Sequence, residues 1–287
     1  MFLGCEIGGT KFQVGVCDRP GRLRALERRT VERKKGAAGI LQQFSEVIPP
    51  LLKKYPVTAI GVGYGGPYDL QRQRAVTSHQ IAGWDGFPVR NWFRRQFGLP
   101  VFVDNDQNCA ALAEATVGAG KGLRCVFYVT VGTGIGGGLV IDGKLHNGRY
   151  GGAEIGHTVI GKHRLEAVAS GLAIERGVST VPQAARYLGV AIANMIAIVN
   201  PDIVIVGGGV STAGEKFFRP LRQTVKRLVF PVFANNYRIV PPQLGQSVVV
   251  VGAALLAARC SRASVKRGVR RNPNGASQKR RYTGGGR

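Results

Sequence analysis

A dense run of polar side chains follows a short apolar segment in the first half of the chain. Residues 100–103 are apolar, and residues 104–108 read Asp-Asn-Asp-Gln-Asn. The end of a strand is a rigid place from which a catalytic group can project. A carboxylate there can accept the proton of an alcohol that attacks a phosphate. Asp and Asn are also preferred helix N-caps, so one residue can cap while another does chemistry.

Two glycine turns offer a second kind of chemistry. Gly8-Gly9-Thr10-Lys11 joins two apolar segments, and residues 132–138 do the same in the second half of the chain. Without Cβ atoms, successive backbone N–H groups can converge on an anion. Thr10 and Thr133 add hydroxyls, and Lys11 adds a positive charge. Either turn alone reads as a tight hairpin, but two turns at equivalent places predict phosphate binding.

The second turn also matches the pattern G-x-G-x-x-G, but its context argues against a dinucleotide site. That fingerprint needs a helix directly after the glycines and an acid about 20 residues further on. Here residues 139–141 are apolar and precede Asp142-Gly143, which signals a hairpin turn. The chain also lacks G-x-x-x-x-G-K-[ST], which excludes a P-loop.

The elements that must position these motifs occur twice in the same order. Each half begins with a strand, a glycine turn and a second strand, and continues with alternating helical and strand patterns. We therefore predict an α/β fold of two duplicated lobes with a ligand cleft between them. The expected strands cover 2–8, 11–17, 57–64, 100–103, 124–131, 139–141 and 203–206, and the expected helices 36–54, 88–97, 105–116, 183–199 and 248–258. We expect an N-terminal lobe over 1–104, a C-terminal lobe over 105–250, a last helical segment over 251–258 that packs back on the N-terminal lobe, and a tail over 259–287.

The basic charge of the chain is concentrated in the tail but extends beyond it. The 287 residues carry a net charge of +24. Residues 259–287 hold ten Lys/Arg and no acid, so residues 1–258 retain a net charge of +14. A basic body suits nucleotides, polyphosphate or nucleic acid, although a general preference for arginine produces the same charge. The tail has few large apolar residues, so we expect it to be disordered and to contact nucleic acid without sequence specificity.

The distribution of apolar residues and cysteines limits the classes of protein to which the chain can belong. Apolar residues make up 44% of the chain, which excludes wholesale disorder. The longest apolar stretch, residues 187–210, is interrupted by polar residues, so no membrane span is predicted. Five scattered cysteines without a Cys-x-x-Cys pair, and an N-terminus unlike a signal peptide, lead us to expect a cytoplasmic protein.

Taken in order, six motifs resemble those of the ROK family (repressor, open reading frame, kinase) of the actin/hexokinase-like superfamily. The resemblance runs from about Phe2 to Ala258. It implies two ribonuclease-H-like lobes and a kinase that transfers the γ-phosphoryl group of ATP to the 6-hydroxyl of a hexose, most often glucose in this family. The motifs are residues 6–11 (Glu-Ile-Gly-Gly-Thr-Lys), 61–67 with Gly83-Trp84, 104–108, 132–138, 151–157 (Gly-Gly-Ala-Glu-Ile-Gly-His) and 200–209.

The resemblance implies a role for each site residue. Asp106 would be the general base, and Glu6 would lie near Mg²⁺, directly or through water. The sugar would be bound by Gly66, Asn105, Glu154, His157 and Glu166. The phosphates and the nucleotide would be held by Gly8, Gly9, Thr10, Lys11, Gly132, Thr133, Gly134 and Gly208.

Three departures from the family pattern qualify these roles. Many members bind a structural zinc ion just after the His157 position, but residues 158–165 contain no cysteine. His157 and His163 alone cannot complete a four-ligand site, so no zinc is expected. The segment between Glu175 and Gln183, which the family often uses in dimer contacts, is short, so a homodimer and a monomer both stay open. Gln80 stands where a sugar-binding Asn is common, which leaves the identity of the hexose open.

Two alternative functions follow from the same residues. The compact outline without zinc resembles the polyphosphate glucokinases of the family, whose anionic donor would suit a basic body. The complete motif at residues 200–209 favours ATP instead. The second alternative is a non-catalytic, sugar-sensing ROK protein. Family repressors carry a helix-turn-helix domain before the first phosphate loop, and because that loop begins at residue 6 here we expect no such domain.

Overall fold

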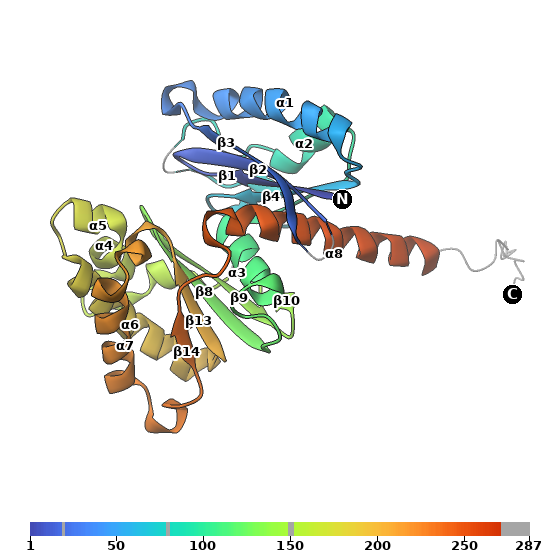
Figure 1. The fold of residues 1–287 in the computed structure, drawn as a ribbon. Coiled ribbons are helices and arrows are strands. Elements are labelled where there is room, and N and C mark those ends of the chain that lie inside the picture. Colours follow the sequence, from blue (N-terminus) through green and yellow to red (C-terminus); the bar gives the residue numbers. More distant parts are fainter. Residues whose placement is uncertain (19–20, 79–80, 149–151, 271–287) are drawn as a thin grey trace, which may run out of the picture.

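The computed structural model arranges the chain as two α/β lobes with two helices between their sheets (Figure 1). It describes residues 1–18, 21–78, 81–148 and 152–270. Gln80, Gly151 and residues 271–287, which the sequence analysis singles out, lie outside the described residues.

The N-terminal lobe is built on a five-stranded sheet with the order β3-β2-β1-β4-β7. The first three strands form an antiparallel meander, and β4 and β7 are parallel to β1. The strands are β1 (Phe2–Ile7), β2 (Lys11–Cys17), β3 (Leu23–Thr30), β4 (Ala59–Tyr64) and β7 (Val101–Asn105). Helices α1 (Gly36–Lys54) and α2 (Val89–Phe97) cover one face, and β5 (Tyr68–Asp69) and β6 (Arg74–Ala75) form a small hairpin beside it.

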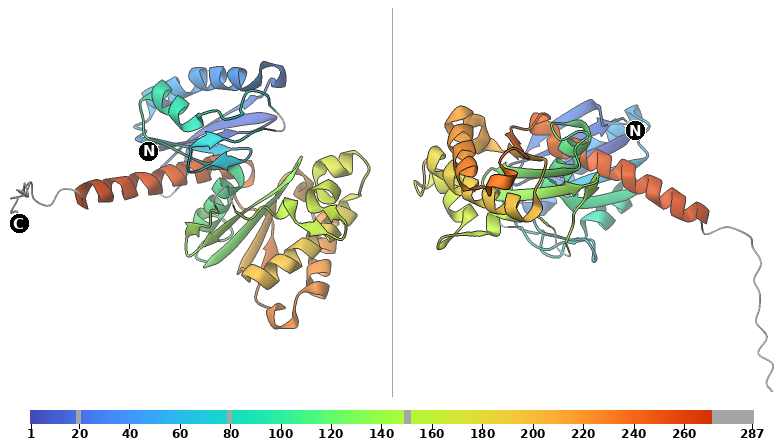
Figure 2. Two further views of the ribbon diagram at one scale, coloured as in Figure 1. Left: turned by 180° about the vertical axis from the view of Figure 1, so that it is seen from behind. Right: turned by 90° about the horizontal axis from the view of Figure 1, so that it is seen from below.

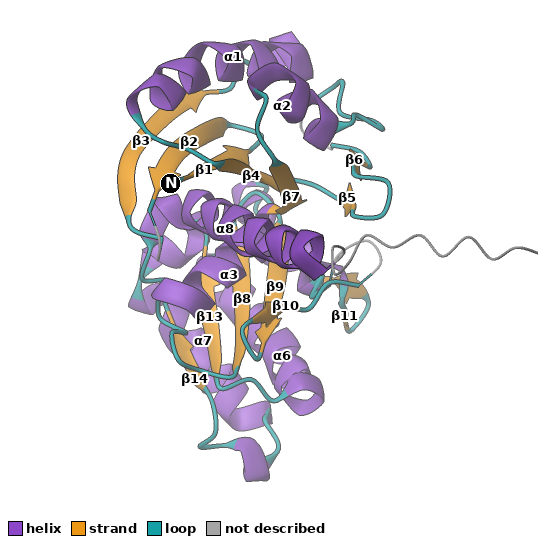
Figure 3. Cartoon of the chain, turned by 90° about the vertical axis from the view of Figure 1, so that its right-hand side faces the viewer, coloured by secondary structure: helices purple, strands orange, loops and turns teal. Residues whose placement is uncertain are grey.

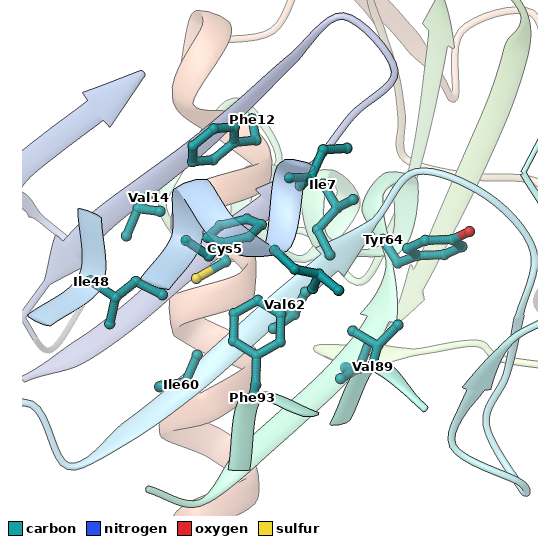
Figure 4. Packing of buried hydrophobic residues seen from close by; sticks show 14 of the residues in the cluster. Cys5, Ile7, Phe12, Val14, Ile48, Ile60, Val62, Tyr64, Val89 and Phe93 are labelled. Carbon is teal, nitrogen blue, oxygen red and sulfur yellow. The ribbon is translucent and has the colours of Figure 1, made fainter. Parts of the chain in front are cut away.

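The core of this lobe is aromatic and lies between the sheet and α1 and α2. The ring of Phe44 lies 4.6 Å from that of Phe12 and 5.2 Å from that of Phe93, measured between centroids. Figure 4 shows Phe12, Val62 and Phe93 within this core. The packing fixes the sheet whose strand ends carry the polar residues of the candidate site.

The C-terminal lobe repeats the same strand order. Its sheet runs β10-β9-β8-β13-β14, again with an antiparallel meander followed by two parallel strands. The identical order confirms the predicted pair of duplicated α/β lobes. The strands are β8 (Cys125–Val131), β9 (Ile135–Ile141), β10 (Lys144–Leu145), β13 (Ile203–Gly207) and β14 (Arg238–Val240). A further hairpin is formed by β11 (Val159–Ile160) and β12 (His163–Arg164), and the helices are α4 (Leu165–Ala169), α5 (Gly171–Glu175), α6 (Val181–Val199) and α7 (Glu215–Leu228).

Helices α3 (Asp106–Val117) and α8 (Val248–Arg270) lie between the two sheets (Figures 1 and 3). Helix α8 packs against β1 and β4 on one side and against α3 on the other. Glycine makes both contacts close, because a Cβ on Gly61 would overlap the carbonyl of Ala253 and one on Gly252 would overlap the carbonyl of Cys109. At both contacts the backbones lie so close together that any residue larger than glycine would clash.

Three of the differences from the sequence prediction have a clear physical reason. Strand β3 was not predicted, because it is an edge strand whose mostly exposed Arg and Glu side chains hide the apolar alternation. Strand β9 begins at Ile135 rather than at residue 139, and Gly136 and Gly138 within it face α3. The predicted disorder is wrong for residues 259–270, because α8 continues to Arg270. Extending an existing helix costs much less than nucleating one, so the segment needs no core of its own.

Among the helices that the structure describes, α6 alone has the length and hydropathy that a membrane span requires. Half of the residues in its most apolar window are buried inside the protein, where the helix packs against α7. The buried core helix of a globular domain meets the same criterion.

Candidate functional site

The polar run after β7 lies where that strand turns into α3. The side chain of Asn105 caps the helix, since its Oδ1 accepts a hydrogen bond of 2.8 Å from the backbone N–H of Gln107. Its Nδ2 donates to the carbonyl of Gly66 at 3.1 Å, which ties β4's loop to the helix start. Asp106 is the first residue of α3, and its Oδ1 accepts from the same Gln107 N–H at 2.9 Å. Asn105 thus does the capping, and Gln107 holds the carboxyl of Asp106 at the first turn of α3.

Asp106 has an acidity suited to proton transfer. Burial, and then repulsion by Glu6, raise its pKa from 3.8 to about 7, against the opposing hydrogen bond from Gln107. Burial also raises the pKa of Glu6, although the hydrogen bond from Gln13 and the charges of Lys11 and Arg28 act in the other direction. The fold thus brings together two carboxylates from β1 and α3, a hundred residues apart in sequence. A base whose pKa lies near neutrality is well matched to accept a proton at physiological pH.

The first glycine turn joins β1 to β2 beside these carboxylates. The carbonyl of Gly9 accepts from Arg33 Nε at 3.1 Å, and that of Thr10 accepts from the N–H of Val31 at 2.9 Å. Within the described residues, the N–H groups of Gly8, Gly9 and Thr10 have no hydrogen-bond partner. With the carbonyls engaged and the N–H groups free, the turn is suited to hold an anion.

The second glycine turn, between β8 and β9, repeats this arrangement. The N–H groups of Gly171 and Leu172, at the start of α5, donate to the carbonyls of Gly132 and Thr133 at 2.7 and 3.4 Å. In the described part of the chain, the N–H groups of Thr133 and Gly134 have no partner. The N–H of Gly132 donates to the carbonyl of Gly134 at 2.9 Å. The N–H groups suited to an anion are therefore those of Thr133 and Gly134, in a turn shorter than the loop over 132–138 that the sequence suggests.

Gly208 follows β13 and packs against the end of β8. Its φ is +89°, a conformation that L side chains rarely adopt, and a Cβ there would overlap the carbonyl of Val131. This close approach places the short helix η3 (Gly209–Ala213) next to the second glycine turn. Glycine at 208 is therefore required by the fold, and the same contact brings a second loop to the anion-binding turn.

Three of the predicted sugar-binding residues gather in the C-terminal lobe. Glu154 precedes the short helix η2 (Ile155–His157), His157 is its last residue, and both are exposed. Partial desolvation raises the pKa of Glu154, His157 lowers it and Glu166 raises it, so the three charges lie within reach of one another. Oε2 of Glu166 accepts from the N–H of Ile135 at 2.7 Å, which anchors it to the second glycine turn.

The other predicted sugar-binding residues, Gly66 and Asn105, lie with Asp106 and Glu6 instead. Among the described residues, no hydrogen bond or ion pair joins Glu154 or His157 to Asp106. The candidate site therefore consists of two groups, one on the N-terminal lobe and the start of α3 and one on the C-terminal lobe.

Sequence reasoning did not single out Gln13, and it gave no role to Asp104 within the polar run 104–108, yet both support the first group. Gln13 is fully buried in β2, and its Nε2 donates to Glu6 Oε2 and to the carbonyl of Gln246. Its signal is a single amide in the otherwise apolar strand β2. Asp104 is buried and accepts hydrogen bonds of 2.8 Å from the side-chain amides of Asn108 and Asn147. That network links β7 to the segment after β10, a distant pairing that local sequence does not show.

The oxygen ligands of the first group suit magnesium. Mg²⁺ binds through one or two carboxylates and retains several waters. Glu6 fits this, because a divalent cation beside it would offset the repulsion that, after burial, helps to raise the pKa of Asp106. In the described residues, no three His, Cys, Asp or Glu side chains are grouped as ligands of one metal ion. His157 and His163 lie in η2 and β12.

Comparison with known proteins adds independent evidence. The ROK family profile matches residues 2–184 and 174–260. The chain is 30% identical to a glucokinase of Thermotoga maritima, over 88% of this chain and 95% of that protein. It is similar in structure to a ROK family glucokinase from Streptomyces griseus solved with glucose and AMPPNP, with a TM-score of 0.80, 29% identity and coverage of 90% and 99%. An inorganic polyphosphate/ATP-glucomannokinase from Arthrobacter sp. has a TM-score of 0.74, 27% identity and coverage of 90% and 98%.

Proposed function

The chain belongs to the ROK family, and on that premise we propose that it is an ATP-dependent kinase that phosphorylates the 6-hydroxyl of a hexose, with glucose as the first candidate. The observation that carries the proposal is the pairing of Asp106, whose pKa is about 7, with two turns of free backbone N–H groups. Phosphoryl transfer needs a positioned base and charge stabilisation more than covalent help from the protein. These two features supply both.

Asp106 would act as the general base. As the 6-hydroxyl oxygen forms its bond to the γ-phosphorus, the hydroxyl proton passes to a carboxylate oxygen of Asp106 and the bond to the leaving ADP oxygen breaks. Asn105 fixes the start of α3, so the carboxylate projects from a rigid element. The hydrogen bond from the N–H of Gln107 to Oδ1 fixes the orientation of the carboxyl that takes the proton.

The two glycine turns would hold the phosphates. Gly8, Gly9 and Thr10 present N–H groups beside the carboxylates, and Lys11 adds a positive charge that already acts on Glu6. Thr133 and Gly134 present theirs from the C-terminal lobe. A group bound to both turns would connect the two lobes, so its binding would favour closure and exclude water from the reacting atoms. Gly208 would form the wall of the nucleotide site beside Gly132.

The sugar would contact both lobes as well. Gly66 and Asn105 are available from the side of Asp106, and Glu154, His157 and Glu166 from the other lobe. Buried polar groups that pair with sugar hydroxyls discriminate strongly against a hexose that lacks one of them. We therefore place the choice of hexose in these contacts.

Glu6 would hold Mg²⁺, directly or through water. When bound, the ion neutralises negative charge on the phosphates. Gln13 supports this role, because its hydrogen bond fixes the Glu6 carboxylate. The reducing cytoplasm, where ATP is available, is the compartment we propose.

Polyphosphate is the second candidate donor. Two observations favour it: the net charge of +14 on residues 1–258, and the structural similarity to a kinase that uses both donors. We rank ATP first because the turn after β13, with Gly208 packed on Val131, is complete.

Phosphorylation of a hexose panel by the purified protein tests the proposal, with ATP and polyphosphate in parallel reactions. We expect turnover with ATP on glucose or a close analogue. Turnover with polyphosphate alone would show that polyphosphate, not ATP, is the donor. Sugar binding without turnover on either donor would show that the protein is a sugar sensor and not a kinase.

A further inference from the structure

A cavity of about 460 Å³ lies where β7, β10 and the middle of α8 meet. Figure 3 shows β7, the β5–β6 hairpin, β10 and the far end of α8 on the same side of the molecule. None of the described residues that line it is Glu6, Gly66, Asn105, Asp106, Glu154, His157 or Glu166. Its volume is within the range of sites that bind small metabolites.

The charged groups of this cavity are mostly cationic. Arg90, Lys144 and Arg259 line it, together with the buried carboxyl of Asp104. Both oxygens of Asp104 are occupied by neutral donors: Oδ1 by Asn108 and the N–H of Asn105, and Oδ2 by Asn147. Even with Asp104 ionised, the lining carries a net charge of +2, so it favours an anion.

The two arginines are held in place without a carboxylate partner. Arg90 Nε donates to the carbonyl of Val101 at 3.0 Å. The guanidinium of Arg259 donates to the carbonyl of Gly143 and, at 2.9 Å, to Thr116 Oγ1. In the described part of the chain, the ion pairs include none of Arg90, Lys144 and Arg259. Desolvation lowers the pKa of Arg259 despite the opposing effect of Cys260, which shows that partly burying this cation has a cost.

The rest of the lining is apolar. Phe102, Leu112, Leu145 and Leu256 form walls from four different elements. Fixed guanidinium groups beside such walls suit a ligand that has an anionic group at one end and an apolar body at the other.

We propose that this cavity is a second binding site, for a small organic anion in which a phosphomonoester or a carboxylate is attached to an apolar body. The anionic group pairs with Arg90, Lys144 and Arg259, and the body lies against Phe102 and the leucines. No residue proposed to contact the sugar, the phosphates or Mg²⁺ lines this cavity, although Asp104 and Asn147, which support the first group, do. Binding there can therefore be tested without any readout of kinase activity.

The cavity contains its own reporter. Cys260 lines it and is partly exposed, whereas Cys5, Cys17, Cys109 and Cys125 are buried. The rate at which N-ethylmaleimide alkylates Cys260, followed by mass spectrometry of the full-length protein, therefore measures occupancy. The probes are phenyl phosphate and phenylacetate, compared with inorganic phosphate and benzyl alcohol, which each carry one half of the proposed ligand. Ionic strength is kept constant, because exposed charges respond to salt.

We expect phenyl phosphate or phenylacetate to slow the alkylation of Cys260 by about fivefold or more, with saturation. Inorganic phosphate and benzyl alcohol should each slow it less at equal concentration. The stronger of phenyl phosphate and phenylacetate shows whether the site prefers a phosphomonoester or a carboxylate. Lys144→Gln, on an exposed side chain, should raise the half-saturating concentration about tenfold, as loss of one charge-assisted contact implies. Arg90→Gln should do the same, and Arg95→Gln, on the exposed side of the same helix, should not. Alkylation that no probe slows, or that is slowed equally in Lys144→Gln, Arg90→Gln and wild type, would overturn the proposal.

Discussion

Replacement of Asp106 by Asn should stabilise the folded protein while it removes the proposed base. The pKa of Asp106 rises from 3.8 to about 7 on folding, mainly through burial. Each pKa unit corresponds to about 1.4 kcal/mol, so ionising the folded carboxyl costs at most about 4 kcal/mol. The side chain is partly exposed and can relax toward water, so we expect a gain in the free energy of unfolding of about 1–3 kcal/mol at pH 8 for Asp106→Asn.

The sign of the pH dependence follows from the same shift. Between pH 3.8 and about 7, the folded protein retains a proton on Asp106 that the unfolded chain has released. Wild-type stability therefore falls as the pH rises through this window, and above it the full cost is present. Asn does not titrate, so the stability gain of the variant should be about 40% of its full size near pH 5 and complete by pH 8.

Urea unfolding of both proteins at pH 5 and pH 8 measures this difference directly. Glu175→Gln is the matched control, because it replaces an exposed carboxylate by an amide. The control should shift stability by less than about 0.5 kcal/mol at either pH. A stability gain for Asp106→Asn that is the same at pH 5 and pH 8 would refute the burial argument.

The catalytic half of this prediction uses the same variant. A positioned general base contributes about 10²–10⁴ to the rate, so kcat for the hexose should fall by about that factor. KM for the sugar should change little, because the Asn side chain keeps the shape of the site. A variant that is more stable but retains full turnover would show that Asp106 is not the general base. The argument that burial raises the pKa of Asp106 would still hold.

The remaining predictions test neighbouring parts of the site. The acid limb of the pH profile of kcat/KM should lie near pH 7 in wild type, and Glu6→Gln should move it downward because repulsion by Glu6 raises the pKa of Asp106; a limb that does not move would contradict their proximity. Gly208→Ala should lose about 2–4 kcal/mol of unfolding free energy in a thermal or urea scan, because of its positive φ and its overlap with Val131, whereas Gly209→Ala, with open space around it, should lose less than about 1 kcal/mol. A chain that ends at Arg270 should keep its sugar kinase rate and bind nucleic acid less strongly than the full chain in a salt-dependent mobility-shift assay; equal binding would exclude residues 271–287 as the contact.

Most elements could be predicted because their signals are local. The apolar face of α1, the turn at residues 8–10 and the capped start of α3 are each visible within a dozen residues. The duplicated strand, turn and strand pattern gave the architecture, because the same order leads to the same sheet in both lobes. Strand β3 was missed because an exposed edge strand carries charges where a buried strand alternates apolar and polar residues.

The candidate site required tertiary information at two points. The pKa of Asp106 depends on Glu6, which lies a hundred residues away, so no local pattern could give it. The buried amide of Gln13, which holds Glu6, is one polar residue in an apolar strand and gains its meaning only from the partner it meets.

The glycines show most clearly why a local pattern is not enough. A run such as Gly132–Gly138 is compatible with two physical demands: free N–H groups for an anion, or the absence of a Cβ where two backbones approach. The structure separates them, since the N–H groups of Thr133 and Gly134 are without partners in the described chain, whereas a Cβ on Gly138 would lie 2.8 Å from Cβ of Ala111. The first part of the run is therefore suited to bind a ligand, and the second part serves the packing of β9 on α3. Because α3 begins with Asp106, that packing also determines where the proposed base stands relative to the second glycine turn.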